Sequence, residues 1–316
     1  MNILVTNDDG YRAKGIRVLA EMMRRYGNVY VVAPKTHQSG MSMAVSLGFK
    51  AIRYKEILHL PASDDGTEGS LTVAYIDATP ASCVKYALDT GVSGWPRPDV
   101  VVSGINHGSN AASASCYSGT LGAAQEAALC GIPAIGVSLC SMNPDADFSA
   151  VEEHFPGIMR KILEANERPS GQNKEKTGLD AGYGIYYNVN FPDIPAGKIR
   201  GIRTGYQGKG HWVREFTDWD PTFYSRHGIT PEMLGQESAP SCEEGEKLYM
   251  MVGTFVDDPG NDSRADHHIL ENGYISVVAH NIDTTDYRET DRLGSLGFDT
   301  DFRNTDIPFS TATTDI

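Results

Sequence analysis

The residues best placed to do chemistry are the adjacent carboxylates Asp8 and Asp9, within the tetrad Asn7-Asp8-Asp9-Gly10. Neighbouring carboxylates repel each other unless a cation offsets their charge, and oxygen ligands favour Mg²⁺ or Mn²⁺. A plain strand-to-helix turn is the alternative, in which an aspartate caps the helix and the glycine bends the chain. The tetrad alone leaves both interpretations open.

Two further loops carry oxygen donors that would complete a cation site. Residues 34–41 hold Ser39, and residues 103–110 hold Asn106 and Asn110. Each loop follows an apolar run expected to be a parallel strand, so both should open at the same edge of the sheet as the Asp pair. Carboxylate, hydroxyl and amide oxygens together suit a hard cation that keeps positions open for substrate. Each polar residue taken alone is also typical of an exposed turn.

Ser118-Gly119-Thr120 lies where an alanine-rich helix is expected to begin. Unpaired backbone amides and the helix dipole make such an N-terminus favourable for an anion. A cation site beside an anion site indicates phosphoryl chemistry. Simple helix capping by Ser118 or Thr120 is the alternative.

Several histidines are candidates for metal ligands or for acid–base catalysis. His37 and His107 fall in the candidate loops, but no zinc-ligand spacing joins them, which favours surface positions. The Asp-His-His run at 266–268 is interpreted as exposed polar residues before a strand at 274–278. The chain has no Gly-x-x-x-x-Gly-Lys-Ser/Thr loop, Gly-x-Gly-x-x-Gly fingerprint or Gly-x-Ser-x-Gly elbow, so P-loop, dinucleotide-binding and hydrolase-elbow functions lose support.

Alternating strands and helices must position these loops. Apolar runs predict strands at 2–6, 28–33, 71–76, 100–102 and 132–139, with a further alternating strand at 43–54. Helical spacing predicts helices at 15–26, 118–131 and 148–165, and one that begins at 79–80. This order indicates βαβ units, and therefore an α/β fold with a Rossmann-like, mostly parallel sheet flanked by helices.

The second half of the chain has a different pattern of predicted elements, with more strands and fewer helices. Residues 1–180 are predicted to form the Rossmann-like catalytic domain, and the polar stretch 166–180 a linker or exposed loop. Residues 181–316 are predicted to be a smaller, β-rich C-terminal part involved in oligomer contacts. Within it, 221–246 shows little periodicity and is interpreted as a loop insertion.

Composition narrows the class of protein. The 27 Lys and Arg against 41 Asp and Glu give a net charge of −14, which argues against binding a nucleic-acid duplex. The five cysteines form no Cys-x-x-Cys pair, so neither a disulfide framework nor a zinc knuckle follows. No signal-like segment opens the chain and no apolar run approaches membrane-spanning length. We therefore expect a cytoplasmic protein without a membrane partner.

Four motifs, in this order, resemble the SurE survival-protein family: Asn7-Asp8-Asp9-Gly10, Ala33-Pro34 with Gln38-Ser39-Gly40, Ser103-Gly104-Ile105-Asn106-His107-Gly108, and Tyr117-Ser118-Gly119-Thr120. The resemblance is strong over residues 1–140 and looser beyond, through 188–192 and 273–276. Members of that family are metal-dependent 5′-nucleotidases that hydrolyse nucleoside monophosphates. Some also act on 3′-nucleotides or short polyphosphate chains.

The resemblance implies a role for each matching residue. One divalent cation per subunit would be held by Asp8, Asp9, Ser39 and Asn106. The phosphate would face Asn110, Ser118, Gly119 and Thr120. Asp8 and Asp9 would be catalytic, and whether Asp8 acts as ligand, base or nucleophile stays open. The family fold also exchanges elements of its β-rich segment between subunits, which implies a homodimer or homotetramer.

The chain departs from the family pattern in three places. Residues 112–114 read Ala-Ser-Ala where the family usually has Gly-x-Asp, which removes a local hydrogen-bond acceptor. Residues 276–280 read Ser-Val-Val-Ala-His where Ser-x-Thr-Pro-Leu is common, and 221–246 has the character of an insertion. Substrate preference and oligomer geometry are the properties these departures affect.

The combined expectation is a Mg²⁺- or Mn²⁺-dependent phosphomonoesterase that acts on nucleoside 5′-monophosphates. A broad-specificity phosphatase or exopolyphosphatase is one alternative. Another is a nucleotide-binding regulator with weakened catalysis, motivated by Ala112 and Ala114 in the candidate loop.

Overall fold

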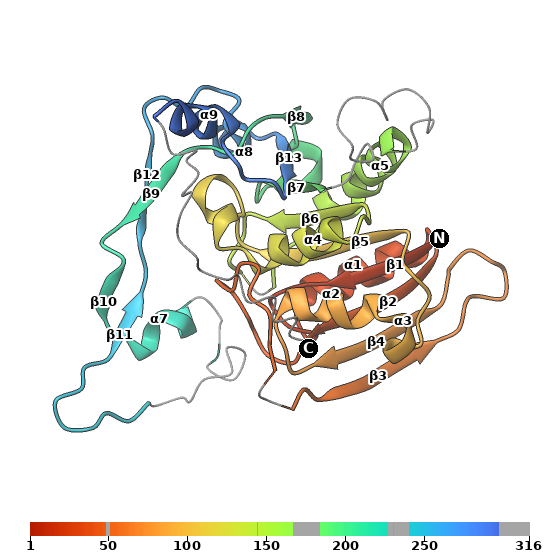
Figure 1. Cartoon of the computed structure of the whole chain (residues 1–316). Coiled ribbons are helices and arrows are strands. Elements are labelled where there is room, and N and C mark those ends of the chain that lie inside the picture. The colour runs from red at the N-terminus through yellow and green to blue at the C-terminus, as the bar shows by residue number, and fades with distance from the viewer. Residues whose placement is uncertain (49–50, 144, 167–183, 227–229, 231–239, 297–316) are drawn as a thin grey trace, which may run out of the picture. The chain divides into compact units, whose positions relative to one another are not determined.

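Nine strands form one sheet in the computed structural model (Figure 1). The structure describes residues 1–48, 51–143, 145–166, 184–226, 230 and 240–296. The strand order is β3-β4-β2-β1-β5-β6-β7-β13-β8. The strands are β1 (Asn2–Thr6), β2 (Asn28–Pro34), β3 (Tyr54–Leu60), β4 (Leu71–Ile76), β5 (Val100–His107), β6 (Ala134–Leu139), β7 (Ile185–Phe191), β8 (Ile202–Thr204) and β13 (Ile275–Asn281). All neighbours pair in parallel except β3 with β4 and β13 with β7.

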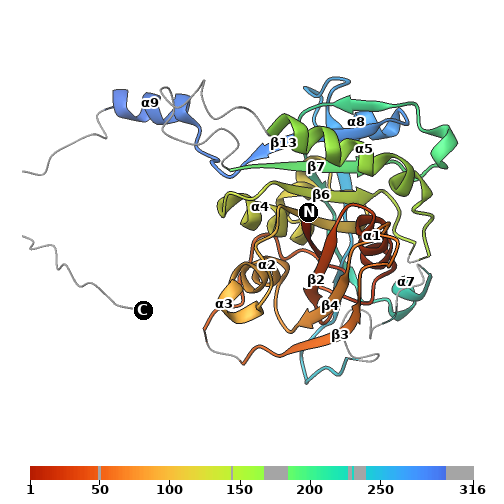
Figure 2. The same ribbon diagram turned by 90° about the vertical axis from the view of Figure 1, so that its right-hand side faces the viewer.

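Helices cover both faces of this sheet. One face is covered by α1 (Lys14–Arg24) and α5 (Ser149–Asn166), and the other by α2 (Pro80–Leu88) and α4 (Gly119–Leu129). The shorter helices are α3 (Thr90–Ser93), α7 (Pro221–Arg226) and α8 (Asp266–Glu271), with 3₁₀ turns at Ala112–Cys116 and Ala196–Lys198. Ile3 and Val5 of β1 pack in the core that α1 and α5 cover, whereas Leu4 packs in the core under α2 and α4 (Figure 2). Because both faces of the central strands are buried, these strands read as continuous apolar runs. The predicted fold class, a mostly parallel sheet flanked by helices, is confirmed.

Two small antiparallel sheets follow in the second half of the chain. β9 (Gly210–Val213) pairs with β12 (Thr254–Asp257), and β10 (Phe216–Asp218) pairs with β11 (Tyr249–Met251). We call residues 210–218 and 249–257 the two-stranded arm. β7, β8 and β13 instead belong to the main sheet, and the proposed division at residue 180 stays a prediction. The predicted linker, 166–180, lies outside the described residues except at its first position. Of the predicted insertion, 221–246, residues 227–229 and 231–239 also lie outside them.

Two predicted elements are wrong in detail. The described part of 43–53 is not a strand, because Ser46 hydrogen-bonds instead to the start of α2: Thr79 N–H donates to Ser46 Oγ at 3.1 Å. The strand nearby is β3, an edge strand whose apolar residues Ile57 and Leu58 are exposed. The loop predicted from 103 begins later, since β5 resumes pairing with β6 at Asn106 after a register shift and continues to His107.

Residues 283–316 make up a separate compact unit. Its described part contains α9 (Tyr287–Ser295), which begins where the Asp286 carboxylate accepts the Glu289 N–H at 3.0 Å. Across the described part of the chain, no helix has the length and apolar character needed to cross a membrane.

Candidate active site

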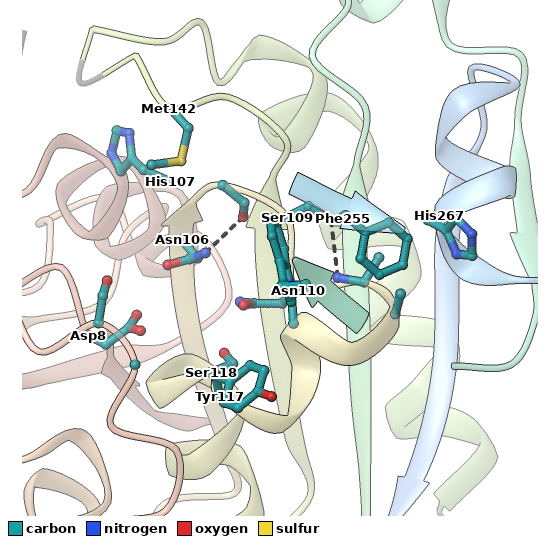
Figure 3. Close-up of a pocket in the computed structure, with 17 residues that line it drawn as sticks. Asp8, Asn106, His107, Ser109, Asn110, Tyr117, Ser118, Met142, Phe255 and His267 are labelled. Carbon is teal, nitrogen blue, oxygen red and sulfur yellow. Dashed lines mark hydrogen bonds between the residues drawn. The ribbon is translucent and has the colours of Figure 1, made fainter. Parts of the chain in front are cut away.

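The candidate site lies where the strand order reverses. β2 and β5 flank β1 on opposite sides, so the chain turns back at this point in the sheet. Ligands of open α/β sheets bind in the crevice at the carboxyl ends of such strands. The structure brings five of the predicted residues to one cavity of about 390 Å³ there (Figure 3), namely Asp8, Ser39, Asn106, Asn110 and Ser118. The predicted common edge is therefore observed.

Asp8 sits against the first turn of α4. Its carboxylate is buried, and Thr120 Oγ1 donates to Asp8 Oδ1 at 2.6 Å. Burial raises the pKa of Asp8, and the hydrogen bond from Thr120 opposes that rise. A Cβ at Gly119 would lie 2.8 Å from Asp8 Cβ, so only glycine allows α4 to come this close. Ser118 caps the helix by accepting the Leu121 N–H at 3.1 Å.

Asp9 is held by the loops on either side. Its Oδ2 accepts the backbone N–H of His107 at 3.1 Å, and its Oδ1 lies 3.5 Å from His37 Nδ1. Burial and the charge of Asp8 hold the pKa of Asp9 well above its usual range. Burial also lowers the pKa of His37 and of His107. Both histidines are half-buried, so the expected surface positions hold only in part.

Asn106 and Ser39 complete the oxygen-rich end of the cavity. Asn106 Nδ2 donates to the Gly108 carbonyl at 2.8 Å, which fixes the amide, and its oxygen points to the side of Asp8 in Figure 3. Ser39 is exposed and lines the same cavity.

This donor set fits a hard divalent cation. Two carboxylates, a hydroxyl and an amide oxygen are the ligands that Mg²⁺ and Mn²⁺ accept. The raised pKa values of Asp8 and Asp9 reflect two like charges buried together, and a bound cation would offset both the burial and the repulsion.

A buried amide network supports Asn110. Its Nδ2 donates to Ser138 Oγ at 2.9 Å, and its backbone N–H donates to Asn190 Oδ1 at 2.9 Å. Asn188 Nδ2 donates to the Asn110 carbonyl at 2.8 Å, and Asn190 Nδ2 donates to Asn188 Oδ1 at 2.8 Å. Sequence reasoning gave these strand residues no place in the site. Two asparagines at alternate positions of an otherwise apolar strand were the available signal, because buried amides need partners.

Asp266 holds the loop that departs from the family pattern. Both of its carboxylate oxygens lie 3.0 Å from the Ala112 nitrogen, and Oδ1 also accepts the N–H of Gly208 at 2.9 Å. Ala112 has φ +49°, a left-handed conformation that a non-glycine residue rarely adopts. Asp266 is fully buried, so its interpretation as an exposed residue is wrong. The loop thus obtains from α8 an acceptor that its own sequence lacks.

The other end of the cavity is aromatic. Trp212 and Phe255 line it, and their rings meet edge to face at 5.7 Å between centroids. Both come from the two-stranded arm, whereas Tyr117 lines the cavity beside Ser118 (Figure 3). Aromatic faces of this kind bind planar rings by stacking.

Comparisons with known proteins agree with this geometry. A family model described as survival protein SurE matches residues 3–214. The chain belongs to the SurE family. This member is 38% identical over 302 residues to a protein named 5′-nucleotidase SurE from Cytophaga hutchinsonii, covering 95% of this chain and 97% of the relative. It is 37% identical over 284 residues to a protein of the same name from Christiangramia forsetii, with 90% and 92% covered.

A solved structure shares the fold of this SurE family member. The crystal structure of the SurE protein from Aquifex aeolicus matches with a TM-score of 0.65 and 25% identity, over 94% of this chain and all of that one. The family predicted from the four motifs is therefore confirmed.

Proposed function

We propose that this protein is a divalent-cation-dependent phosphomonoesterase that hydrolyses nucleoside 5′-monophosphates to nucleoside and phosphate. The observation that carries the proposal is one cavity with the buried carboxylate of Asp8 at one end and aromatic rings at the other. A nucleoside monophosphate has the matching polarity, with a doubly charged phosphate and a planar base. Relatives named 5′-nucleotidase SurE, at 33–38% identity over most of the chain, support the same reaction.

At the phosphate end, one cation of the Mg²⁺ or Mn²⁺ type is proposed to be held by Asp8, Asp9, Ser39 and Asn106. When bound, the cation supplies positive charge that offsets the phosphate and the two carboxylates. Asp8 and Asp9 are the proposed catalytic residues. Thr120 fixes the orientation of Asp8, and the His107 N–H fixes that of Asp9.

The chain's own donors are proposed to stabilise the developing charge on the phosphate. The first turn of α4, at Ser118, Gly119 and Thr120, presents backbone amides and the positive end of a helix dipole. Asn110 lies in the same cavity and is locked by Ser138 and the buried asparagines beneath it. Donors fixed in advance need no reorganisation as charge develops, which is the main electrostatic contribution to such reactions.

The assembly and location are part of the proposal. The arm exposes large apolar side chains, including Phe216 at 71% and Met251 at 61%, which is typical of a surface that meets another chain. We propose a homodimer or homotetramer with contacts from residues 181–316. The five free cysteines suit a reducing compartment, and we propose the cytoplasm.

Phosphate release from a panel of substrates tests the proposal. The panel contains nucleoside 5′- and 3′-monophosphates, sugar phosphates and polyphosphate, each with EDTA, Mg²⁺ or Mn²⁺. We expect turnover of 5′-monophosphates that EDTA abolishes and either metal restores. Asp9→Asn should remove it, whereas Asp64→Asn, in an exposed turn, should not.

Three outcomes would contradict the proposal. Full activity in EDTA or in Asp9→Asn would exclude the metal-site assignment. Faster hydrolysis of polyphosphate or sugar phosphates would favour a broad phosphatase. Tight nucleotide binding in calorimetry without phosphate release would favour a regulator.

A further inference from the structure

Three side chains, of which His267 lines the cavity, converge in a way that the proposed reaction does not use. Asp257 ends β12, and His267 and His268 lie in the first turn of α8. His267 Nε2 lies 2.9 Å from Asp257 Oδ1, and His268 Nε2 lies 2.9 Å from Asp257 Oδ2. One ligand atom from each residue falls within 4.8 Å of the others.

The His268 imidazole is oriented by an oxygen behind it. His268 Nδ1 lies 2.9 Å from the carbonyl of Asp262, which can only accept, so Nδ1 carries the proton. His267 Nδ1 is buried 3.5 Å from Asp266 Oδ1 and makes no hydrogen bond. An acceptor behind Nδ1 is the arrangement that turns Nε2 of a histidine toward a metal.

We propose that Asp257, His267 and His268 form a second metal site, suited to a transition-metal ion of the Zn²⁺ type. Two imidazole nitrogens and one carboxylate are ligands that Zn²⁺ favours, whereas Mg²⁺ prefers oxygen. The Asp257 side chain is 41% exposed, which leaves a fourth position open to water or another ligand. The site thus differs in chemistry from the oxygen-rich site at Asp8.

The geometry requires only a small adjustment. Metal–ligand distances of about 2.0–2.2 Å in a tetrahedron place neighbouring ligand atoms about 3.3–3.6 Å apart. The two observed Nε2···Oδ distances of 2.9 Å reach different oxygens of Asp257, so one oxygen has to turn toward both imidazoles. One ligand atom of each residue already lies within 4.8 Å of the others. Rotation of the exposed Asp257 side chain supplies such a shift without moving the backbone.

A metal here would fasten the two-stranded arm to α8. Phe255 lies two residues before Asp257 on β12, and its ring meets that of His267 edge to face at 5.6 Å (Figure 3). His267 itself lines the cavity. Bound metal would therefore hold the aromatic wall of the cavity in place.

Metal binding to the full-length protein tests the site directly. Protein stripped with EDTA is titrated with Zn²⁺ against a chromophoric chelator, with Mg²⁺ in large excess to occupy the oxygen-rich site. We expect one Zn²⁺ per chain, and a visible Co²⁺ absorption typical of tetrahedral nitrogen ligation. His268→Ala and His267→Gln should each lose this ion.

His211→Ala is the matched control. His211 pairs with Val256 on the arm, and Asp257 pairs with the next residue, Gly210. Because successive residues of a strand point to opposite faces, His211 lies on the face of the arm opposite to Asp257. This variant should bind Zn²⁺ as the unaltered chain does. Circular dichroism checks that each variant folds. Absence of the Co²⁺ spectrum from the unaltered protein, or equal Zn²⁺ stoichiometry in a folded His268→Ala, would overturn the proposal and leave an ion-paired cluster only.

Discussion

Replacing Thr120 by valine isolates one hydrogen bond at the centre of the candidate site. Thr120 and valine have nearly the same shape, so Thr120→Val removes the hydroxyl and little else. The lost bond joins a buried hydroxyl to the buried Asp8 carboxylate at 2.6 Å. Hydrogen bonds to charged groups contribute about 1.5–3 kcal/mol, and about 1.4 kcal/mol corresponds to tenfold. We expect kcat/KM for a nucleoside 5′-monophosphate to fall about 10- to 150-fold on that basis.

Thr120→Ser is the matched control for this experiment. It keeps the hydroxyl and loses one buried methyl group, which costs about 1 kcal/mol of folding free energy. We expect its kcat/KM to stay within about threefold of the unaltered enzyme, since the hydrogen bond remains. Steady-state kinetics at saturating cation and thermal melting are measured together. If Thr120→Val retains full activity, or if activity simply follows melting temperature across both variants, Thr120 does not position Asp8.

Two further predictions concern packing and thiol chemistry. Gly119→Ala should lower the free energy of unfolding by about 1–3 kcal/mol in a denaturant titration, because its Cβ would overlap the neighbouring carboxylate side chain. Gly157→Ala, in α5 with open space around it, should be neutral or stabilising, and equal losses in both variants would contradict the close-approach argument. Burial raises the pKa of the Cys140 thiol to about 11, so at pH 8 only about one molecule in a thousand is thiolate. Iodoacetamide should therefore label exposed Cys242 before half-buried Cys140, and mass spectrometry should show Cys140 labelling rise about tenfold per pH unit up to pH 10. Rapid labelling of Cys140 at pH 8 would contradict the raised pKa of its thiol.

The central strands and the first site residues were predictable because the signals are local. The apolar runs at 3–5 and 31–33 are buried on both faces, so no polar residue interrupts them. Parallel strands end at a common edge, which places Asp8 and Asn106 together without any knowledge of side-chain contacts.

The residues that hold the site loop in place were not predictable, because their contacts join distant parts of the chain. Asn188 contacts Asn110 across 78 positions, and Asp266 contacts Ala112 across 154. A single sequence contains no trace of such pairs until the fold brings them together. Edge strand β3 was not predicted for a different reason: Ile57 and Leu58 are adjacent, so its apolar residues do not alternate as in a half-buried strand.

The two ends of the cavity are encoded by separate stretches of chain, and this has an evolutionary consequence. The carboxylates and helix terminus come from the first 120 residues and are embedded in the sheet, where substitutions disturb many neighbours. Trp212 and Phe255 come from the two-stranded arm, where changes disturb few. Selection for a new base or a different organic group can therefore act on the arm alone, while the hydrolytic machinery is inherited unchanged.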